Sequence, residues 1–425
     1  MKKTLVALAA LAATSAFAQS SVTAYGVLDV AYKNYELINA NGATVIKSKG
    51  VSDGTNAGPR LGFKGVEDLG NGRNANFVAE FGITVADPAG ISNRTGAEGA
   101  QVYGLSNSGN MPVGAYSAGS NTRQAYVAVG DSKLGELRAG YQYTELYNTS
   151  TNTGFFIGQE QPGGFLHKLS NAEFGGTRAN SIVYVSPKLA NTTVVTAQYG
   201  AGTGRDTNET DLAAGQAGYT KNNIKRQSLG ALFEQGPLRV GAAYTTVKVA
   251  QDLSTTSTTS YGTTYNAYSV GTAQTADSRA YDYRANLTQL NASYDFGMIK
   301  PVVQYMNGTK TIDAINTTGG ASASGAANSN GIMTAATGAY KYKATSYGAT
   351  VPYGSATFFL LTGTGTVESA TATAYDYKQT QYGVRYALSK RSTAYFAAGN
   401  TKDDAATTTG YAKSKYSAIG VTHSF

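Results

Sequence analysis

The 425-residue sequence predicts an all-β fold, a transmembrane antiparallel β-barrel of sixteen strands with long extracellular loops and short periplasmic turns. Three observations lead to this prediction. Charged residues make up only 14% of the chain, and Gly (51) and Tyr (31) abound, whereas soluble proteins carry about 25% charged residues. Segments of about ten residues alternate apolar and polar side chains, as tilted membrane-crossing strands do. An export signal is present, and no later apolar run approaches the ~20 residues of a transmembrane helix.

The first 18 residues have the pattern of a cleavable signal peptide. Lysines at positions 2 and 3 precede an apolar stretch at 5–13, and the A-x-A motif at 16–18 supplies the small residues that signal peptidase requires. We therefore expect a mature chain that begins at Gln19 and forms one barrel domain over 19–425. Removal of the two lysines would lower the formal net charge from +8 to +6.

The first mature segment, residues 22–33, shows the strand period clearly. Its even positions carry Val, Ala, Gly, Leu, Val and Tyr, and its odd positions include Thr, Tyr, Asp and Lys. In a membrane barrel the apolar face contacts lipid and the polar face lines the lumen. A secreted β-sandwich produces the same alternation and remains an alternative. Tyr and Phe near the segment ends, where aromatic girdles lie, favour the barrel.

The next two predicted strands form a hairpin. Arg60 and Lys64 share the polar face of its first strand, so both are predicted to line the pore. If the hairpin pairs around Gly70, Glu80 lies across from Arg60, and Asn76 lies across from Lys64. A cross-strand carboxylate would hold the guanidinium against the wall, and the alternative is two independently solvated charges. Glu80 is therefore a candidate for the narrow part of the pore.

Short turns alternate with long polar stretches along the whole chain. The turns lie at 67–72, 130–135, 186–191, 234–237, 295–298, 352–354 and 389–391. The long stretches lie at 34–57, 85–120, 145–177, 251–280 and 309–341. The last two are low in charge and rich in small residues, which fits exposed loops. Counting both kinds of connection predicts sixteen strands, and closure into a barrel gives every backbone N–H and C=O in lipid a partner.

Six segments resemble the Gram-negative general porins, in the family's order. They read SVTAYGVLD at 21–29, RLGFKGVEDLG at 60–70, RQAYV at 123–127, QYTELY at 142–147, RANSIVYVSP at 178–187 and GVTHSF at 420–425. The resemblance implies a homotrimer in the outer membrane of a Gram-negative bacterium, among lipids that include lipopolysaccharide. It also implies that the third extracellular loop, about 145–177, folds into the lumen. Phe425 matches the C-terminal signal that the family presents to the barrel-assembly machinery.

The resemblance further implies a constriction at which wall arginines face acidic groups on the third loop. Arg60, Arg123 and Arg178 occupy the matching wall positions. For Arg123 the alternation agrees with a lumenal position if Tyr126 and Ala128 face lipid. The alternative is that these arginines bind lipid head groups at the rim. An arginine on the lipid face near the midplane would cost about 2–4 kcal/mol, which favours the lumen.

The third loop offers Glu145, Glu160 and Glu173 as acids. Glu173 begins an E-F-G-G run that is similar to one in this loop of some family members. Glu160 is better placed by its distance along the chain from Arg178. We regard Glu160 and Glu173 as equal candidates to face the arginines.

The expected function is passive diffusion of small hydrophilic solutes and ions, with a mild anion preference from lumenal arginines. Val27 and Tyr141 stand where many relatives carry a cation, which argues against a strong preference. A substrate-specific channel for a sugar or an organic anion, or a surface adhesin, remains the alternative. We expect no enzymatic activity, because His167 and His423 have no Asp nearby in sequence and no hydrolase or phosphate-loop motif occurs.

Composition also bears on cofactors and partners. Without Cys and with only two His, we expect no metal and no other cofactor. The basic residues are spread along the chain without a basic run, so we expect no nucleic-acid binding.

Overall fold

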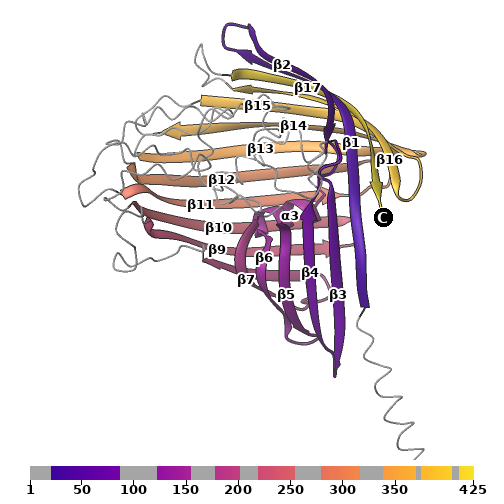
Figure 1. Ribbon diagram of the computed structural model, residues 1–425, viewed down its shortest axis with the longest axis vertical. Helices are drawn as coiled ribbons and strands as arrows, with labels where there is room; N and C mark the ends of the chain where they lie inside the picture. The colour runs from indigo at the N-terminus through magenta and orange to yellow at the C-terminus, as the bar shows by residue number, and fades with distance from the viewer. Residues whose placement is uncertain are drawn as a thin grey trace, which may run out of the picture.

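The computed structural model describes residues 21–86, 122–154, 178–201, 219–253, 279–315, 338–369, 375–403 and 411–425. This part of the chain is built from antiparallel strands with one short helix, α3 (Glu145–Asn152) (Figure 1). The strands are β1 (Ser21–Asn39), β2 (Thr44–Asp53), β3 (Arg60–Gly70), β4 (Arg73–Gly82), β5 (Thr122–Asp131), β6 (Gly135–Tyr143), β7 (Arg178–Val185), β8 (Thr193–Ala201), β9 (Tyr219–Gln235), β10 (Leu238–Leu253), β11 (Arg279–Tyr294), β12 (Lys300–Ile315), β13 (Gly338–Tyr353), β14 (Ala356–Ser369), β15 (Tyr375–Ala387), β16 (Ser392–Asp403) and β17 (Tyr411–Ser424). No helix among the described residues is long and apolar enough to span a membrane.

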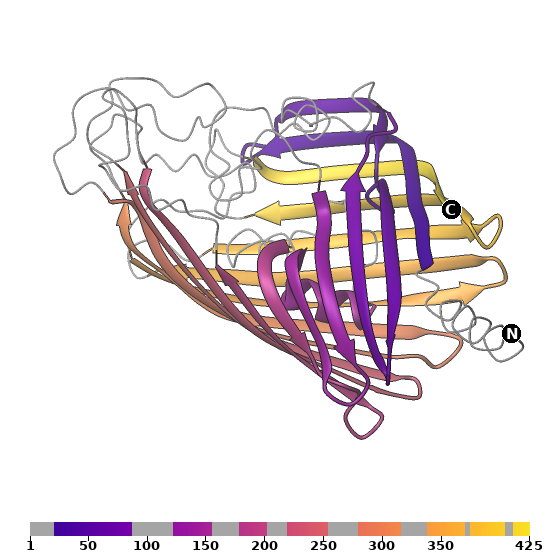
Figure 2. The same ribbon diagram turned by 60° about the horizontal axis from the view of Figure 1, so that its bottom comes forward.

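The strands close into a barrel with sixteen strand positions, which confirms the predicted fold (Figure 2). From β3 to β17 each strand pairs with the next one along the chain. Closure comes from β17 pairing with β1, from Val27↔Ser424 to Asn39↔Tyr411. On its other side β1 pairs with β3 through its N-terminal part and with β2 through its C-terminal part. The strands β2 and β3 follow one another along the same side of β1 and count as one interrupted strand of the barrel, so the seventeen segments make sixteen strands.

The predicted short turns all join strands, and the β3–β4 turn corrects a predicted register. Its central residues Asn71-Gly72 both have positive φ, 54° and 77°, as a two-residue type I′ turn requires. The hairpin is therefore centred beyond Gly70. Glu80 pairs with Gly62 and Asn76 with Val66, each two residues along from the partner that the sequence predicts.

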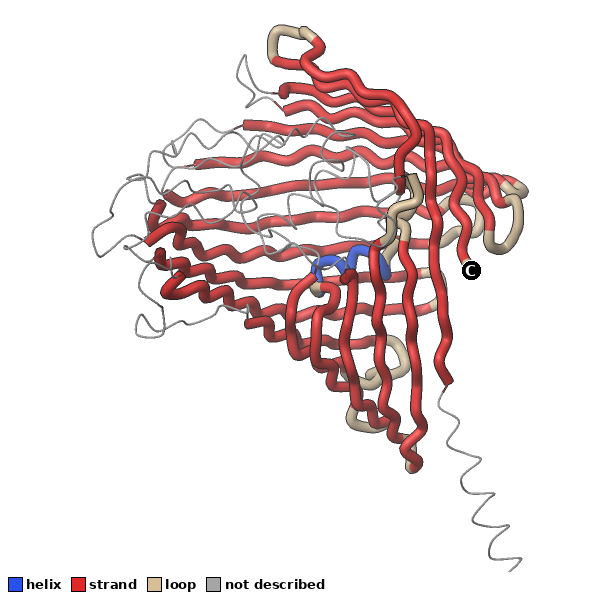
Figure 3. Tube along the Cα trace, in the orientation of Figure 1, coloured by secondary structure: helices blue, strands red, loops and turns tan. Residues whose placement is uncertain are grey.

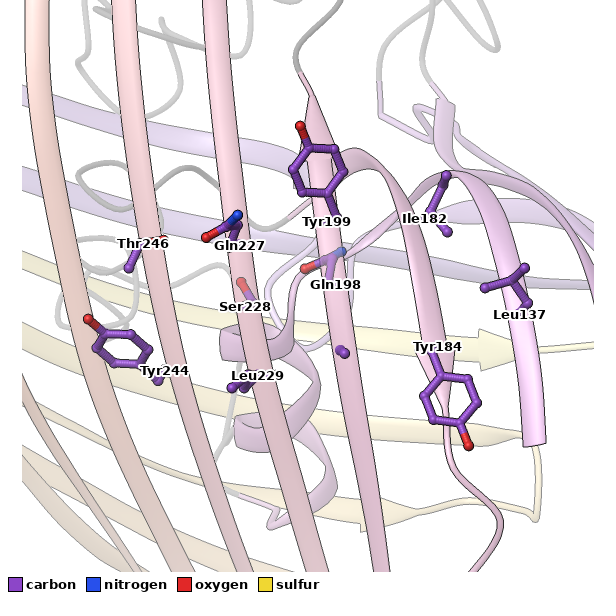
Figure 4. Close-up of a pocket in the computed structure, with 11 residues that line it drawn as sticks. Leu137, Ile182, Tyr184, Gln198, Tyr199, Gln227, Ser228, Leu229, Tyr244 and Thr246 are labelled. Carbon is purple, nitrogen blue, oxygen red and sulfur yellow. The ribbon is translucent and has the colours of Figure 1, made fainter. Parts of the chain in front are cut away.

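Alternation along the strands places exposed apolar side chains on the outer face, as predicted, whereas the inner face is mixed rather than polar throughout: on β10–β15 it also carries a buried apolar cluster that includes Val247, Tyr283 and Met306. Apolar side chains are exposed on the outer face, where a shallow groove over β6–β10 is lined by Leu137, Ile182, Tyr184, Leu229 and Tyr244, among others (Figure 4). The inner face carries buried carboxamides and hydroxyls, including Gln198, Ser228, Gln289, Asn291, Gln304 and Gln381. Such a division suits a barrel with lipid outside and water within.

Strand pairing extends further than the sequence predicts. The stretch 34–57, which we expected to be a loop, contains the end of β1 and all of β2. The expected loop 251–280 likewise contains the end of β10 and the start of β11, and the expected loop 309–341 contains the end of β12 and the start of β13. Across the extension of β1 and β2, Glu36 pairs directly with Lys47, their Oε1 and Nζ atoms 2.6 Å apart, and Tyr35 is buried in an apolar cluster of the inner wall. The remaining predicted loop residues, 87–120, 155–177, 254–278 and 316–337, lie outside the described residues.

Helix α3 lies inside the barrel against β9, β10 and β11 (Figure 3). Glycines on the wall make room for it: a Cβ at Gly230 would lie 2.5 Å from Glu145 Oε2, and one at Gly241 would press on the next turns of the helix. The Gln289 side chain on β11 donates hydrogen bonds from Nε2 to the α3 backbone and to Ser150 Oγ, the latter at 2.7 Å. The helix is thus fixed to the wall by both fit and hydrogen bonds.

Candidate functional site

Three of the predicted residues meet on the inner wall where β3, β4 and β5 run side by side. Glu80 is 3% exposed, and its Oε1 accepts a hydrogen bond from Arg123 Nε at 2.9 Å. Its Oε2 lies 4.0 Å from Arg60 Nη1 and accepts a hydrogen bond from the Tyr25 hydroxyl at 3.1 Å. The predicted Glu80–Arg60 pair is therefore long and diagonal, because Glu80 stands directly across from Gly62, and Arg123 is the closer partner.

A β-bulge places Arg123 beside Glu80. The register between β4 and β5 skips Arg123, so this residue is extra in its strand, and a bulge re-aims the side chain that it carries. The prediction that Tyr126 and Ala128 face lipid is wrong: Ala128 is 4% exposed, whereas Val127 is 65% exposed and faces outward. The simple alternation failed here because the bulge reverses its phase.

Arg178 joins the same cluster through Tyr143. The Tyr143 hydroxyl accepts hydrogen bonds from Arg123 Nη2 at 3.2 Å and from Arg178 Nη2 at 3.1 Å. The Arg178 guanidinium also lies 4.6 Å from the centre of the Tyr143 ring, a cation–π distance. Tyr143 in turn stacks on Tyr147 of α3, with ring centres 4.2 Å apart. The cluster is thereby connected to the helix inside the barrel.

Lys64 lies two rows further along β3 than Arg60. It is exposed, and its Nζ lies 5.7 Å from the centre of the Tyr25 ring. The wall cluster of Arg60, Glu80, Arg123 and Arg178 therefore carries three guanidinium groups and one carboxylate, with Lys64 nearby. Its formal charge is positive even after the ion pairs are counted.

Residues 54–59, between β2 and β3, form a second element against the inner wall. Asp29 is fully buried, and its Oδ2 accepts a hydrogen bond from the Asn56 backbone N–H at 2.8 Å. At the end of this element the carbonyl of Gly58 accepts a hydrogen bond from Arg60 Nε at 3.0 Å. The break in the strand position thus fixes the first arginine of the cluster.

Glu145 anchors α3 and does not face the arginines. Its Oε2 accepts a hydrogen bond from the Thr196 hydroxyl of β8, and its Oε1 accepts one from Asn148 Nδ2 at 3.1 Å. Burial raises the pKa of the Glu145 carboxyl above its ordinary value, against the lowering effect of these two hydrogen bonds. Glu160 and Glu173, the two acids expected opposite the arginines, lie outside the described residues, as does His167.

The C-terminus completes the closure of the barrel. The backbones of Phe425 and Gly26 exchange two hydrogen bonds of 3.1 Å each. The Phe425 ring covers Gly26 so closely that a Cβ at this glycine would collide with it. His423 is exposed on the last strand, with its Nδ1 2.9 Å from Ser392 Oγ. Among the described residues no group of His, Cys, Asp and Glu side chains could hold a metal ion.

Sequence reasoning missed the two tyrosines that complete the cluster. Tyr25 and Tyr143 both lie in segments quoted for the family resemblance, each close to a strand end. Their abundance in the sequence hid their role, because a tyrosine near a strand end is equally expected in an aromatic girdle. The hydrogen bonds of Tyr25 with Glu80 and of Tyr143 with Arg123 each join residues of different strands, which no local pattern reveals.

Comparisons with known proteins agree with this architecture. The model of a family described as Gram-negative porin matches residues 4–325. An outer membrane porin protein of Bordetella pertussis is 26% identical over 261 residues, which are 57% of this chain and 59% of that protein. The chain thus spans about three fifths of this curated relative. An anion-selective porin from Comamonas acidovorans has a TM-score of 0.59 at 18% identity, over 96% of this chain and 100% of that one. The trimer form of OmpT, an outer membrane protein of Vibrio cholerae, has a TM-score of 0.55 at 14% identity, over 96% of this chain and 99% of that one.

Proposed function

The chain belongs to the Gram-negative porin family, and from this premise we propose that its barrel is an outer-membrane channel for passive diffusion of small hydrophilic solutes and ions. The observation that carries the proposal is the wall cluster of Arg60, Glu80, Arg123 and Arg178, where basic groups outnumber acids on the inner face. The chemistry of the cluster is that of binding and steering rather than of catalysis.

The proposed mechanism is electrostatic. Guanidinium groups fixed by Glu80 and Tyr143 present a positive surface to the water in the lumen, and such a surface raises the local concentration of anions. Acidic groups opposite would add a transverse field that favours polar solutes over apolar ones. We assign that role to Glu160 and Glu173 of the third loop, and we place Arg60, Arg123, Arg178 and Glu80 at the constriction.

The anion preference should be mild. Each arginine of the cluster donates a hydrogen bond to the wall: Arg60 to the Gly58 carbonyl, Arg123 to Glu80 and Arg178 to Tyr143. The Glu80 carboxylate also neutralises one of the three positive charges. An anion-selective porin is among the proteins of similar fold, which is consistent with this sign of selectivity.

The same family membership supports proposals on biogenesis and assembly. Residues 1–18 would direct export and be removed, and Phe425 would be read by the barrel-assembly machinery. We propose a homotrimer among outer-membrane lipids that include lipopolysaccharide, with the third loop, about 145–177, folded into each lumen. A solved protein of similar fold has a trimer form.

Planar-bilayer recordings on the refolded protein test the function. We expect stepwise ohmic conductance, and in a KCl gradient a small reversal potential of the sign that indicates anion preference. Absence of any ion conductance would refute the channel, and clear cation selectivity would refute the assigned role of the arginines. Replacement of both Arg60 and Arg123 by Gln should reduce the anion preference without closing the channel.

A further inference from the structure

Two lysines stand side by side on the outer face of the barrel. Lys225 on β9 and Lys248 on β10 are directly opposite each other in the strand register, and both are exposed. Like charges in such positions destabilise a sheet. In the part of the chain that the structure describes, neither lysine forms an ion pair with a carboxylate. Arg284 on β11, also exposed, is opposite Lys248 and continues the basic row onto a third strand.

The lysine pair, Lys225 and Lys248, lies at the upper edge of the apolar band. Lys225 is ten residues before Gln235, the last residue of β9, and Lys248 is ten residues after Leu238, the first residue of β10. At about 3.3 Å per residue and a strand tilt of about 40°, ten residues rise about 25 Å, which is the height of the apolar band of a membrane barrel. Because the short β9–β10 turn is on the periplasmic side, the lysine pair is at the level of the outer-leaflet head groups.

The outer face directly below the lysine pair becomes polar and then apolar. One row down, Gln227 is opposite Thr246, and in the next row Leu229 is opposite Tyr244. All four side chains line the shallow groove over β6–β10, which has a volume of about 440 Å³ (Figure 4). The groove follows these two rows across the strands, and Ala197 on β8 is the smallest side chain that lines it. Cations, uncharged hydrogen-bonding groups and an apolar groove thus follow one another down the wall.

A phosphorylated lipid carries its groups in the same order, with phosphate above, ester or amide linkages next and acyl chains below. Lysine is a common binder of phosphate, and the carboxamide of Gln227 and the hydroxyl of Thr246 suit the linkages. We propose that the lysine pair and the groove beneath it form a binding site for a phosphorylated lipid of the outer leaflet, of the lipid A type. Its phosphate contacts Lys225 and Lys248, and one acyl chain occupies the groove. The site goes beyond the channel function and rests on the orientation of the barrel, with its short turns in the periplasm.

A lipid titration of the full chain tests the site. The protein is refolded from lipid-free inclusion bodies into detergent, and bound lipid A is counted by native mass spectrometry. We expect lipid A with both phosphates to bind much more tightly than lipid A without them. In K225Q/K248Q the dissociation constant should rise about 25-fold, since each basic residue near a lipid surface contributes about fivefold. A197W fills the groove and keeps both lysines, and it should weaken binding about tenfold, the contribution of about two buried methylene groups.

A matched control is K341Q/K343Q, which removes two lysines that are exposed on the outer face of β13. Lys343 is also ten residues from the end of its strand at Tyr353, and no cation is opposite either lysine. This control should bind lipid A as the wild type does.

Several outcomes would overturn the site. They are unchanged binding in K225Q/K248Q, an equal loss in K341Q/K343Q, and equal affinity for lipid A with and without phosphate. Binding that A197W leaves unchanged would show that the groove holds no acyl chain. Inorganic phosphate that displaces lipid A at equal concentration would indicate a site for free phosphate instead. Lipid binding in detergent does not depend on conduction, so a protein that binds lipid A but fails to conduct refutes the channel separately.

Discussion

Replacement of Glu80 by Gln should make the channel more anion-selective and less stable. The side chain keeps its shape but loses its charge, so the formal charge of Arg60, Arg123, Arg178 and residue 80 together rises from +2 to +3. One unit charge acts on an ion about 6 Å away with about 0.7 kcal/mol in water, and screening at 0.1 M salt roughly halves this energy. Because anions gain what cations lose, the anion-to-cation permeability ratio should rise about three- to fourfold.

The stability effect follows from the same contacts. The Glu80 and Arg123 side chains are 5% and 15% exposed, and the 2.9 Å bond between them is charge-assisted. Hydrogen bonds to charged groups contribute about 1.5–3 kcal/mol, so E80Q should unfold more readily by about that amount. Reversal potentials in a KCl gradient and thermal unfolding in detergent measure the two effects. Glu234→Gln, at the β9–β10 turn, is the control and should leave the reversal potential unchanged. A reversal potential that E80Q does not move, or moves toward cations, refutes the lumenal assignment of the cluster.

Three further changes test the closure and the inner helix. Gly26→Leu should prevent efficient refolding, because the added side chain meets the Phe425 ring; refolding yields in detergent equal to wild type would contradict this contact. Glu145→Gln should stabilise the protein at neutral pH, since a raised carboxyl pKa means that ionisation above it opposes folding. This advantage should vanish below the unfolded pKa of about 4.3, and an advantage that persists in acid would argue against the cause. Gly241→Leu should displace α3 at a cost of about 1–3 kcal/mol and increase open-channel noise, whereas quiet currents like those of wild type would show that the helix does not border the conduction path.

The sequence predicted the barrel well because barrels repeat a local rule. Period-two alternation and the short turns are visible in single segments, and together they led to sixteen strands. The predictions of strand register and of loop boundaries were less accurate. Asn71-Gly72 shifted the first hairpin by two residues, and β1 and β2 extend through backbone pairing, with Glu36 opposite Lys47, into a stretch whose sequence resembles a loop. These features depend on turn dihedrals and cross-strand partners, which composition does not report.

The candidate site forms where the barrel departs from regularity, which explains why its members could be named but not paired from the sequence. Arg60 follows the 54–59 break and is held by Gly58, Arg123 is the extra residue of a bulge, and Arg178 is the first residue of β7. The bulge turns the Arg123 guanidinium toward Glu80, against the alternation of its strand, whereas Arg178 reaches Tyr143 from the regular start of β7. Deletion of Thr122 would place Arg123 opposite Phe81, restore the alternation and direct the Arg123 side chain to lipid. The charge of the pore wall is therefore set by backbone irregularities as much as by residue types, and a comparison of porins by residue identity alone would miss it.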